Sequence, residues 1–453
     1  MLTPSNTIVS SERRLLMGLG VTGQSVARWW RRQGVKFTAI ETREELASHS
    51  AAVADVDPAA VTFGEVDASW ADGFTEMIVS PGVPLDHPLV VRASEQGCRV
   101  RGDIDLFVEA AKAPVVGITG SNGKSTVTSL LGEMIESCGV KVAVGGNLGR
   151  PALDLLPDEA DLYVLELSSF QLERAETLGL HLATVLNICA DHLDRYATVS
   201  EYHRAKHAIF RKVSQVVANR DDPLTVPLIS DSVPVTWWRM GEPDLGEFGV
   251  REIDGASCIC RGFEKLMCCD ALQITGDHNI ANVLAALALG SALDLPMAGL
   301  LDGAAKFRGL PHRCQLVRKL NGVRYIDDSK GTNVGATEAG LIGLSSEGPI
   351  WLILGGQGKG QDFSQLQQVV SERCAGVLVL GQAAAEITEQ LGGAARVEQV
   401  ATVEEAVLQA SWLARPGETV LLSPACASLD MFSSYVERGE RFQDAVQALE
   451  VAA

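Results

Sequence analysis

The sequence predicts an α/β protein of three domains, each built on a mostly parallel sheet. Short apolar, β-branched segments alternate with amphipathic helical segments along the chain. Two Gly-rich turns, at residues 18–23 and 117–125, each follow an apolar strand and open a helix. The length of 453 residues suits roughly three domains. We expect a Rossmann-like domain at residues 1–102, a central P-loop ATPase-like domain at 103–307 and a second Rossmann-like domain at 308–453.

Composition and charge narrow the class of protein. The chain is 46% hydrophobic and 21% charged, as ordinary globular proteins are. A net charge of −19 argues against nucleic-acid binding, which needs a basic face. The chain contains no run of 18 apolar residues, so no membrane span is expected. The first residues lack the pattern of a secretory signal, and we expect a cytoplasmic protein.

The first domain carries a diphosphate-binding pattern. Residues 14–41 comprise a strand, the turn Gly18-x-Gly20-x-x-Gly23, a helix and a strand that ends in Glu41. This pattern sets a diphosphate on a helix N-terminus and offers a carboxylate to sugar hydroxyls. UDP satisfies these requirements as well as NAD does. A second turn, SPG, follows the next apolar strand, and βα alternation continues to about residue 102.

The central domain opens with VVGITGSNGKSTVT, residues 115–128. The segment predicts a buried strand, a Gly-rich loop and a helix start, where backbone N–H groups bind phosphate. Lys124 adds a positive charge. The strict P-loop pattern requires a glycine at position 118, where this chain has isoleucine, so the loop is one residue longer. We interpret it as a nucleoside triphosphate site rather than an ordinary βα turn.

Two strand ends of the central domain carry polar residues. The apolar strand within residues 161–170 ends at Glu166, where a Mg²⁺ ligand belongs beside a phosphate loop. A strand-end carboxylate with no metal is the alternative. The strand at residues 183–188 leads to Asp191 and His192, at the functional edge of the sheet.

Two helical segments follow these strands. Residues 201–212 predict a helix, and by sequence alone Lys206 reads as a solvated lysine on it. The segment HNIANVLAALAL predicts a long apolar helix. The side chains of His278, Asn279 and Asn282 in its first turns either line a nucleotide pocket or cap the helix.

The third domain has polar loops at three strand ends. KFRGLPHRCQLV, from Lys306, predicts a linker because Gly and Pro punctuate it. Strands at 323–326, 351–354 and 419–423 then lead into DDSKGTN, GGQGKGQDF and SPACASLDMF. This edge of the sheet predicts a ligand face opposite the phosphate loop.

The cysteines do not predict a metal site. Of the ten, Cys258, Cys260, Cys268 and Cys269 cluster, but their spacing is not the paired C-x-x-C of zinc sites. Reduced cytosolic thiols are the preferred interpretation. The role of the cluster stays open.

Motifs along essentially the whole chain resemble the Mur ligases, the ATP-dependent amide-forming ligases of peptidoglycan precursor synthesis. They occur in the family's order: TGSNGKST, LELSSFQLE, DHLDRY, YHRAKHAIF, HNIANVLAALAL, FRGLPHR, DDSKGTN, GGQGKGQDF and LSPACASLDMF. SPACASLDMF, and DDSKGTN with GLPHR, resemble the family member that joins D-glutamate to UDP-N-acetylmuramoyl-L-alanine. The meso-diaminopimelate motif DNPR or DNPAR is absent from the sequence, and folylpolyglutamate synthetases share the scaffold but not these loops.

The resemblance implies a role for each matching residue. Lys124, His192, Lys206 and Lys359 are the expected catalytic residues. One Mg²⁺ is expected on Ser125 and Glu166, and a second on His192 and a carbamylated Lys206. ATP is expected to bind Gly120, Ser121, Asn122, Gly123, Lys124, Ser125, Thr126, Asn282, Arg313 and Asp328. The uridine diphosphate end of the substrate is expected to bind Gly20, Val21, Thr22, Glu41, Thr42, Arg43, Ser80, Pro81 and Gly82. Asn147 is expected at the muramoyl-alanine end, and D-glutamate is expected to bind Thr332, Lys359, Ser428, Leu429 and Tyr435.

Two residues depart from the family pattern, which often has Asp at Glu41 and Phe near Tyr435.

We expect a monomer. Three alternatives remain at this stage: another Mur-type or folylpolyglutamate-type ligase, an NAD-dependent oxidoreductase that rests on the first Gly-rich turn, and a non-catalytic nucleotide switch that rests on the second.

Overall fold

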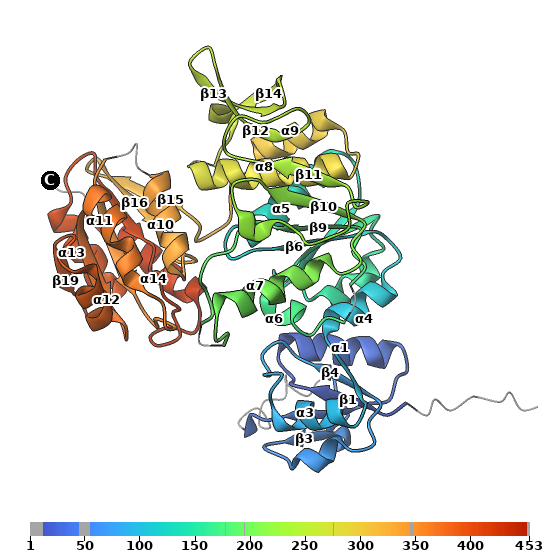
Figure 1. The fold of residues 1–453 in the computed structure, drawn as a ribbon. Coiled ribbons are helices and arrows are strands. Elements are labelled where there is room, and N and C mark those ends of the chain that lie inside the picture. The colour runs from blue at the N-terminus through green and yellow to red at the C-terminus, as the bar shows by residue number, and fades with distance from the viewer. Residues whose placement is uncertain are drawn as a thin grey trace, which may run out of the picture.

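The strands form three sheets that follow one another along the chain, with helices on their faces (Figure 1). The computed structural model describes residues 12–44, 55–176, 178–193, 195–274, 276–344 and 348–450. Most strand pairs are parallel, which confirms the predicted α/β class. Figure 1 shows the first and third sheets lying apart, each against the central part of the chain.

The first sheet has five parallel strands in the order β3-β2-β1-β4-β5. Because β1 pairs with both β2 and β4, the strand order reverses beside it, which is where α/β sheets bind ligands. The loops after Met17 and Val79 leave this point side by side. The elements are β1 (Arg14–Met17), α1 (Val21–Arg32), β2 (Thr38–Glu41), β3 (Val61–Phe63), β4 (Glu76–Val79), α3 (Pro88–Glu95) and β5 (Arg99–Arg101).

The central sheet has nine strands in the order β14-β13-β12-β11-β10-β9-β6-β8-β7. The part from β12 to β7 is parallel, and β12, β13 and β14 form an antiparallel extension that the sequence analysis did not predict. The strands are β6 (Val115–Thr119), β7 (Val142–Gly146), β8 (Leu162–Glu166), β9 (Leu182–Val185), β10 (Gln215–Asn219), β11 (Val235–Trp238), β12 (Phe248–Ile253), β13 (Ala256–Arg261) and β14 (Glu264–Cys268). The helices are α4 (Asp103–Ala110), α5 (Lys124–Ser137), α6 (Ser169–Leu172), α7 (Val199–His207), α8 (Asp277–Ala292) and α9 (Met297–Lys306).

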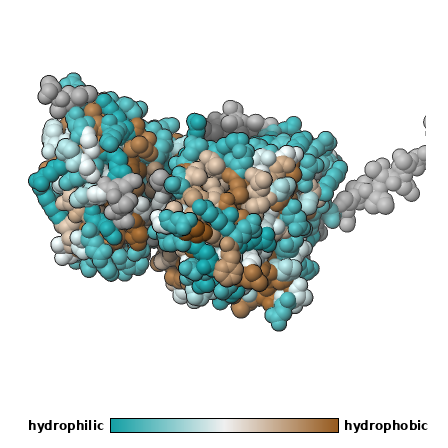
Figure 2. All heavy atoms as spheres, turned by 90° about the horizontal axis from the view of Figure 1, so that it is seen from above, coloured by the Kyte–Doolittle hydropathy of each residue, from teal (hydrophilic) through white to brown (hydrophobic). Residues whose placement is uncertain are grey.

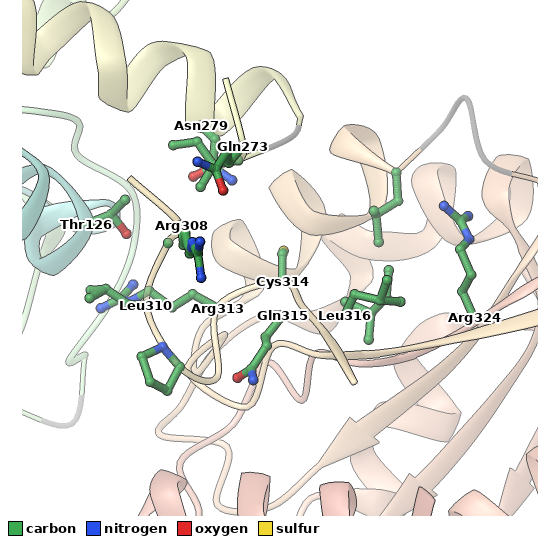
Figure 3. Close-up of a pocket in the computed structure, with 15 residues that line it drawn as sticks. Thr126, Gln273, Asn279, Arg308, Leu310, Arg313, Cys314, Gln315, Leu316 and Arg324 are labelled. Atoms are coloured by element: carbon green, nitrogen blue, oxygen red, sulfur yellow. The ribbon is translucent and has the colours of Figure 1, made fainter. Parts of the chain in front are cut away.

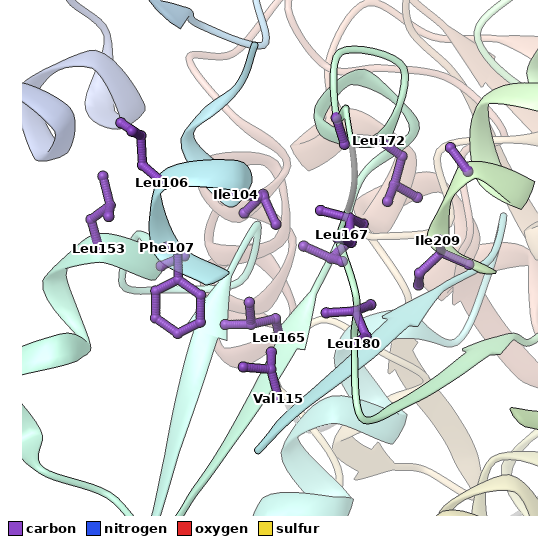
Figure 4. Close-up of a cluster of buried hydrophobic side chains, with 14 of the residues drawn as sticks. Ile104, Leu106, Phe107, Val115, Leu153, Leu165, Leu167, Leu172, Leu180 and Ile209 are labelled. Atoms are coloured by element: carbon purple, nitrogen blue, oxygen red, sulfur yellow. The ribbon is translucent and has the colours of Figure 1, made fainter. Parts of the chain in front are cut away.

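Both faces of the central sheet are buried, as a parallel sheet requires. In Figure 4, Ile104 and Phe107 of α4 lie over one face, together with Val115 of β6 and Leu165 of β8. Val116 and Ile118 of β6 point to the other face, where α5, α8 and α9 pack. Because α4 completes this core, we propose the first domain boundary before it, at residues 102/103.

The third sheet has six strands in the order β15-β16-β20-β17-β18-β19, and only the β15–β16 pair among these is antiparallel. We propose its domain boundary at 307/308, in the segment between α9 and β15. The strands are β15 (Gln315–Leu320), β16 (Val323–Asp327), β17 (Ile350–Gly355), β18 (Cys374–Leu380), β19 (Val397–Gln399) and β20 (Thr419–Leu422). The helices are α10 (Val334–Gly343), α11 (Gln367–Arg373), α12 (Ala384–Leu391), α13 (Val403–Leu413) and α14 (Tyr435–Ala448).

Two elements end earlier than the sequence predicts. Strand β9 stops at Val185, and the chain then crosses the sheet edge as a loop. Helix α7 stops at His207 and continues only as a 3-10 turn, Ala208–Phe210. The chain turns away at Lys212, whose φ of 55° is incompatible with a right-handed helix.

The face of the molecule drawn in Figure 2 is mainly polar, with scattered apolar side chains. Figure 2 shows small hydrophobic patches among hydrophilic residues and two bodies that meet along a narrow junction. Within the described ranges, no helix has both the length and the apolar character needed to cross a membrane.

Candidate active site

The phosphate loop joins β6 to α5 and leaves the N-terminus of α5 open to a ligand. Gly123 precedes α5 with a φ of 81°, which disfavours any residue with a side chain. A Cβ atom there would lie 2.5 Å from Oδ1 of Asn282. Glycine therefore permits both the turn and the close approach of α8. The backbone N–H groups at the start of α5 fit the anion site that the sequence predicts.

Two lysine side chains meet beneath this loop. Nζ of Lys124 donates to the carbonyl oxygens of Gly120 and Ser121, at 2.8 Å each. Nζ of Lys206 donates to the same Gly120 oxygen at 2.8 Å. Lys206 is only 1% exposed, so the interpretation of a solvated lysine is wrong. Burial, followed by the charge of Lys124, holds the pKa of Lys206 well below its ordinary value.

The two carboxylate oxygens of Glu166 differ in their hydrogen bonding. Oε1 accepts a hydrogen bond of 2.6 Å from Nδ2 of Asn147. Oε2 is buried and has no hydrogen-bond partner within the part of the chain that the structure describes. Burial raises the pKa of this carboxyl, but Lys124 and hydrogen bonds outweigh it and the net pKa is lowered. An ionised, unpartnered carboxylate oxygen beside a phosphate loop fits a Mg²⁺ ligand.

His192 has an uncommon backbone conformation, and its ring packs against two aromatic side chains. Its φ is 54°, an uncommon value for a residue other than glycine. Its ring lies 4.8 Å from the ring of Phe170 and 6.4 Å from that of Tyr202. The carboxylate of Asp191 accepts the backbone N–H of His192 at 2.9 Å.

A cavity of about 560 Å³ connects these groups to the third domain. Nζ of Lys359 lies 3.8 Å from Oδ1 of Asp191 across it. The cavity brings together the predicted phosphate, metal and D-glutamate residues from both domains. They are Ser121, Asn122, Gly123, Lys124, Ser125, Asn147, Glu166, His192, Lys206, Arg313, Thr332, Lys359, Ser428, Leu429 and Tyr435.

A second cavity, of about 360 Å³, adjoins the loop and contains Thr126, Asn282, Arg313 and Asp328. Nη2 of Arg313 crosses from the third domain to Oγ of Ser125 at 2.7 Å. Burial raises the pKa of Asp328 to about 7. These residues surround the mouth of the phosphate loop, where the rest of a nucleotide would extend.

The first domain has its own cavity, of about 380 Å³. Its lining includes the nine predicted uridine diphosphate residues: Gly20, Val21, Thr22, Glu41, Thr42, Arg43, Ser80, Pro81 and Gly82. The carboxylate of Glu41 accepts the Leu19 N–H at 2.7 Å and two hydrogen bonds from the Arg43 guanidinium. The longer Glu41 side chain thus braces the first Gly-rich turn.

A further cavity of about 560 Å³ lies along the linker, between the second cavity and the third sheet (Figure 3). Figure 3 shows Arg308, Leu310 and Arg313 following the linker, with Asn279 on one side and Arg324 on the other. This space separates the two domains on one side of their junction.

The structure therefore gathers the predicted residues, with the exception of Gly120, into three cavities: two adjoin the phosphate loop and the third lies in the first domain. Gly120 contributes its carbonyl oxygen to the two lysines instead. Sequence reasoning missed Tyr202 and gave no individual role to Lys330 and Asn333 of the predicted ligand-face loop DDSKGTN; all three line the cavity. Tyr202 and Lys206 share a helix face at i and i+4, a signal that could have indicated burial.

The cysteine cluster is separate from these cavities. Sγ of Cys258 lies 3.4 Å from Sγ of Cys268 across the β13–β14 pair. Among the described residues, no group of three or more His, Cys, Asp or Glu side chains is arranged to hold a metal. The metal ligands predicted here instead combine one carboxylate and one imidazole with a hydroxyl and a modified lysine.

Sequence models of three Mur ligase domains match the chain in order: the MurD-like N-terminal domain at residues 12–102, the middle domain at 118–290 and the glutamate ligase domain at 312–426. The chain belongs to the Mur ligase family, and it is a ligase of this ATP-using class. It is 50% identical over 447 residues to a Pseudomonas aeruginosa protein called UDP-N-acetylmuramoylalanine–D-glutamate ligase, covering 98% of this chain and 99% of that one. A Marinobacter nauticus protein of the same name is 46% identical over 445 residues, covering 98% and 100%.

Solved structures share the fold at low sequence identity. UDP-N-acetylmuramate-alanine ligase MurC from Thermotoga maritima has a TM-score of 0.60 at 18% identity, covering 96% of this chain and 99% of that one. MurF from Thermotoga maritima, solved in complex with ADP, has a TM-score of 0.57 at 16% identity, covering 82% and 95%. These matches confirm the predicted three-domain α/β fold.

Proposed function

We propose that the protein joins D-glutamate to the L-alanyl carboxylate of UDP-N-acetylmuramoyl-L-alanine, with ATP as the energy source, in peptidoglycan precursor synthesis in the cytoplasm. The observation that carries this proposal is the 560 Å³ cavity in which Lys124 and Glu166 face Lys359 and Ser428 from another domain. The reaction must bring the ATP phosphate, the carboxylate that accepts it and the amine of the amino acid together in one cavity. A junction between two domains provides such a cavity. The names of the relatives support the choice of substrates.

The chemistry follows from the poor reactivity of a carboxylate. Transfer of the ATP γ-phosphoryl group to the L-alanyl carboxylate gives an acyl phosphate and ADP. The amine of D-glutamate then attacks the carbonyl carbon, and the tetrahedral intermediate releases inorganic phosphate and leaves an amide. Lys124 and the N–H groups of the phosphate loop would neutralise charge on the transferring group.

Mg²⁺ is expected to supply charge neutralisation and orientation of the phosphates when it is bound. Ser125 and Glu166 would hold one ion, and the free Oε2 of Glu166 supports that role. His192 and carbamylated Lys206 would hold the second. An ammonium cannot ligate a cation, whereas the neutral amine that burial favours can add CO₂ and become an oxygen donor.

The remaining residues would position the two organic substrates. Lys359 and Ser428 would bind the carboxylates of D-glutamate, because a small dianion needs charged and hydrogen-bonding donors. Asn147 would orient the muramoyl-alanine end while it also positions Glu166. The 380 Å³ cavity of the first domain would bind the uridine diphosphate end, which lies remote from the reacting atoms.

A substrate panel tests this proposal. Phosphate release should be measured with ATP, Mg²⁺ and UDP-N-acetylmuramoyl-L-alanine in the presence of D- and L-amino acids one at a time. We expect release that requires D-glutamate. Phosphate release with a different amino acid would support ligase activity but contradict the choice of D-glutamate as substrate. No release with any amino acid would contradict the proposal.

A further inference from the structure

The side chain of Asn333 lies where the third domain touches the central one. Asn333 immediately precedes helix α10 and is 3% exposed. Its Oδ1 accepts the backbone N–H of Ala336 at 2.8 Å, which caps the helix. Aspartate or serine could perform this capping equally well, so capping alone does not require an amide.

The other hydrogen bonds of Asn333 leave its own domain. Nδ2 donates to Oδ1 of Asn122 at 3.1 Å and to Oδ2 of Asp191 at 3.3 Å. Nδ2 of Asn122 donates back to Oδ1 of Asn333 at 3.4 Å. A primary amide has two N–H donors and an oxygen with two lone pairs. All four are therefore used, and three of them reach the central domain.

The two partners belong to different loops of the cavity. Asn122 lies in the phosphate loop, between β6 and α5. Asp191 accepts the backbone N–H of His192 and lies 3.8 Å from Nζ of Lys359. One buried amide thus contacts the phosphate loop directly and, through one carboxylate, the loops of His192 and Lys359.

The neighbouring backbone fixes Asn333 rigidly in the third domain. Oε1 of Gln361 accepts the Val334 N–H at 2.8 Å, and its Nε2 donates to the Ala425 oxygen at 3.1 Å. Any rotation of the third domain about the linker must therefore move the Asn333 amide away from its partners. The bonds can form together only when the domains have this relative position.

We propose that Asn333 is a positioning residue that couples closure of the third domain to the alignment of the phosphate loop and the His192 loop. The inference rests on the proposed function for the identity of the ligands, but not for the coupling itself. In the open arrangement the Asn122 and Asp191 side chains lose this partner, so the nucleotide and amino-acid parts of the site form together on closure. Binding of one ligand in the cavity then favours binding of the other.

Two variants separate capping from coupling. Asn333→Asp keeps the capping oxygen, removes both N–H donors and places a carboxylate against Asp191. Asn333→Ser also keeps a capping oxygen but is too short to reach across the junction. Both variants should melt within a few degrees of the unsubstituted protein, because the cap remains.

The readouts are small-angle X-ray scattering of the ligand-free protein, affinity for a non-hydrolysable ATP analogue with Mg²⁺, and steady-state kinetics. For Asn333→Asp we expect a larger radius of gyration, about tenfold weaker analogue binding and a raised KM for D-glutamate. The KM for the UDP-linked substrate should rise by a smaller factor than the other two, because its uridine diphosphate end binds in the first domain and only its muramoyl-alanine end enters the shared cavity. In Asn333→Ser, the radius of gyration, the analogue affinity and the KM for D-glutamate should change in the same direction by a smaller factor.

The inference would be overturned if both variants had the same scattering and the same analogue affinity as the unsubstituted protein. Equal increases in all three KM values would also overturn it, because that result indicates a general loss of structure. If the unsubstituted protein turns over no substrate, the proposed function fails, whereas the scattering and analogue-binding measurements still decide the role of Asn333.

Discussion

At the scale of single residues, the account depends on two lysines that share the Gly120 carbonyl oxygen, the buried Lys206 and the half-buried Lys124. The Lys124 ammonium is directed into the phosphate loop, where it donates to two carbonyl oxygens. Lys124→Ala should lower the rate of phosphate release about 100-fold or more, because it removes a preorganised cation from the transferring group. The fold should persist, as judged by circular dichroism. Retained activity would contradict the assignment of the phosphate loop.

Lys206 is expected to act only after modification. Lys206→Ala should lose most activity, since the oxygen donors of the carbamate disappear with the side chain. Short carboxylic acids added to the variant should partly restore the rate, because they can place a carboxylate in the vacated space. Activity should be measured with and without acetate or propionate, with Lys212→Ala as a surface control. Full activity of Lys206→Ala without rescue would disprove the carbamate.

The sequence indicated most of these residues but not their surroundings. Lys124 follows from the phosphate-loop pattern alone, and the resemblance to the family predicted Lys206. The burial of Lys206 and the bonds of Asn333 could not be predicted from local patterns. Asn333 and Asn122 are separated by 211 positions in the chain, and only the packing of two domains brings them together.

At the scale of elements, helix α4 begins with a buried carboxyl that is costly to ionise. Asp103 is 3% exposed, and burial raises its pKa from 3.8 to about 6. The pKa of Asp103 is higher in the folded state than in the unfolded state, so ionising this carboxyl destabilises the fold. This destabilisation is fully present above about pH 6 and disappears below about pH 4. Asp103→Asn should therefore raise the free energy of unfolding by about 3 kcal/mol at pH 7.5 and by about 1 kcal/mol at pH 4.5.

Urea unfolding of the two proteins at both pH values measures this difference. Asp105→Asn is a matched control on the same helix. The carboxylate of Asp105 accepts the backbone N–H groups of Gly102 and Glu176, so the control should be destabilised at pH 7.5. A gain for Asp103→Asn that is the same at both pH values would show that ionisation is not its cause.

The pattern of elements followed from the sequence wherever apolar strands alternate with amphipathic helices. The β12–β14 extension was missed because its strands are half-exposed and rich in charged and sulfur-containing residues. Its antiparallel pairing also breaks the βα pattern on which the prediction relied. The early end of α7 was missed because its last turn keeps helical periodicity through residues 208–210 as a 3-10 turn.

At the scale of the whole molecule, the number of sheets, the family and a third-domain edge that faces the phosphate loop could be predicted, but the individual contacts that fix the domains against one another could not. The arrangement seen here depends on contacts across the junction, such as that from Arg313 to Ser125. No periodicity or short motif encodes these contacts. They nevertheless decide whether the phosphate loop and Lys359 share one cavity, and that cavity is the basis of the proposed chemistry.

The most direct test follows oxygen atoms from the substrate carboxylate to the phosphate product. UDP-N-acetylmuramoyl-L-alanine with both carboxylate oxygens labelled with ¹⁸O should be incubated with the protein, ATP, Mg²⁺ and D-glutamate, and the products analysed by mass spectrometry. Formation of an acyl phosphate predicts that each amide formed releases one inorganic phosphate carrying one ¹⁸O atom, with the second ¹⁸O retained in the amide. Amide formation with unlabelled phosphate, or labelled substrate recovered without any amide, would contradict the account.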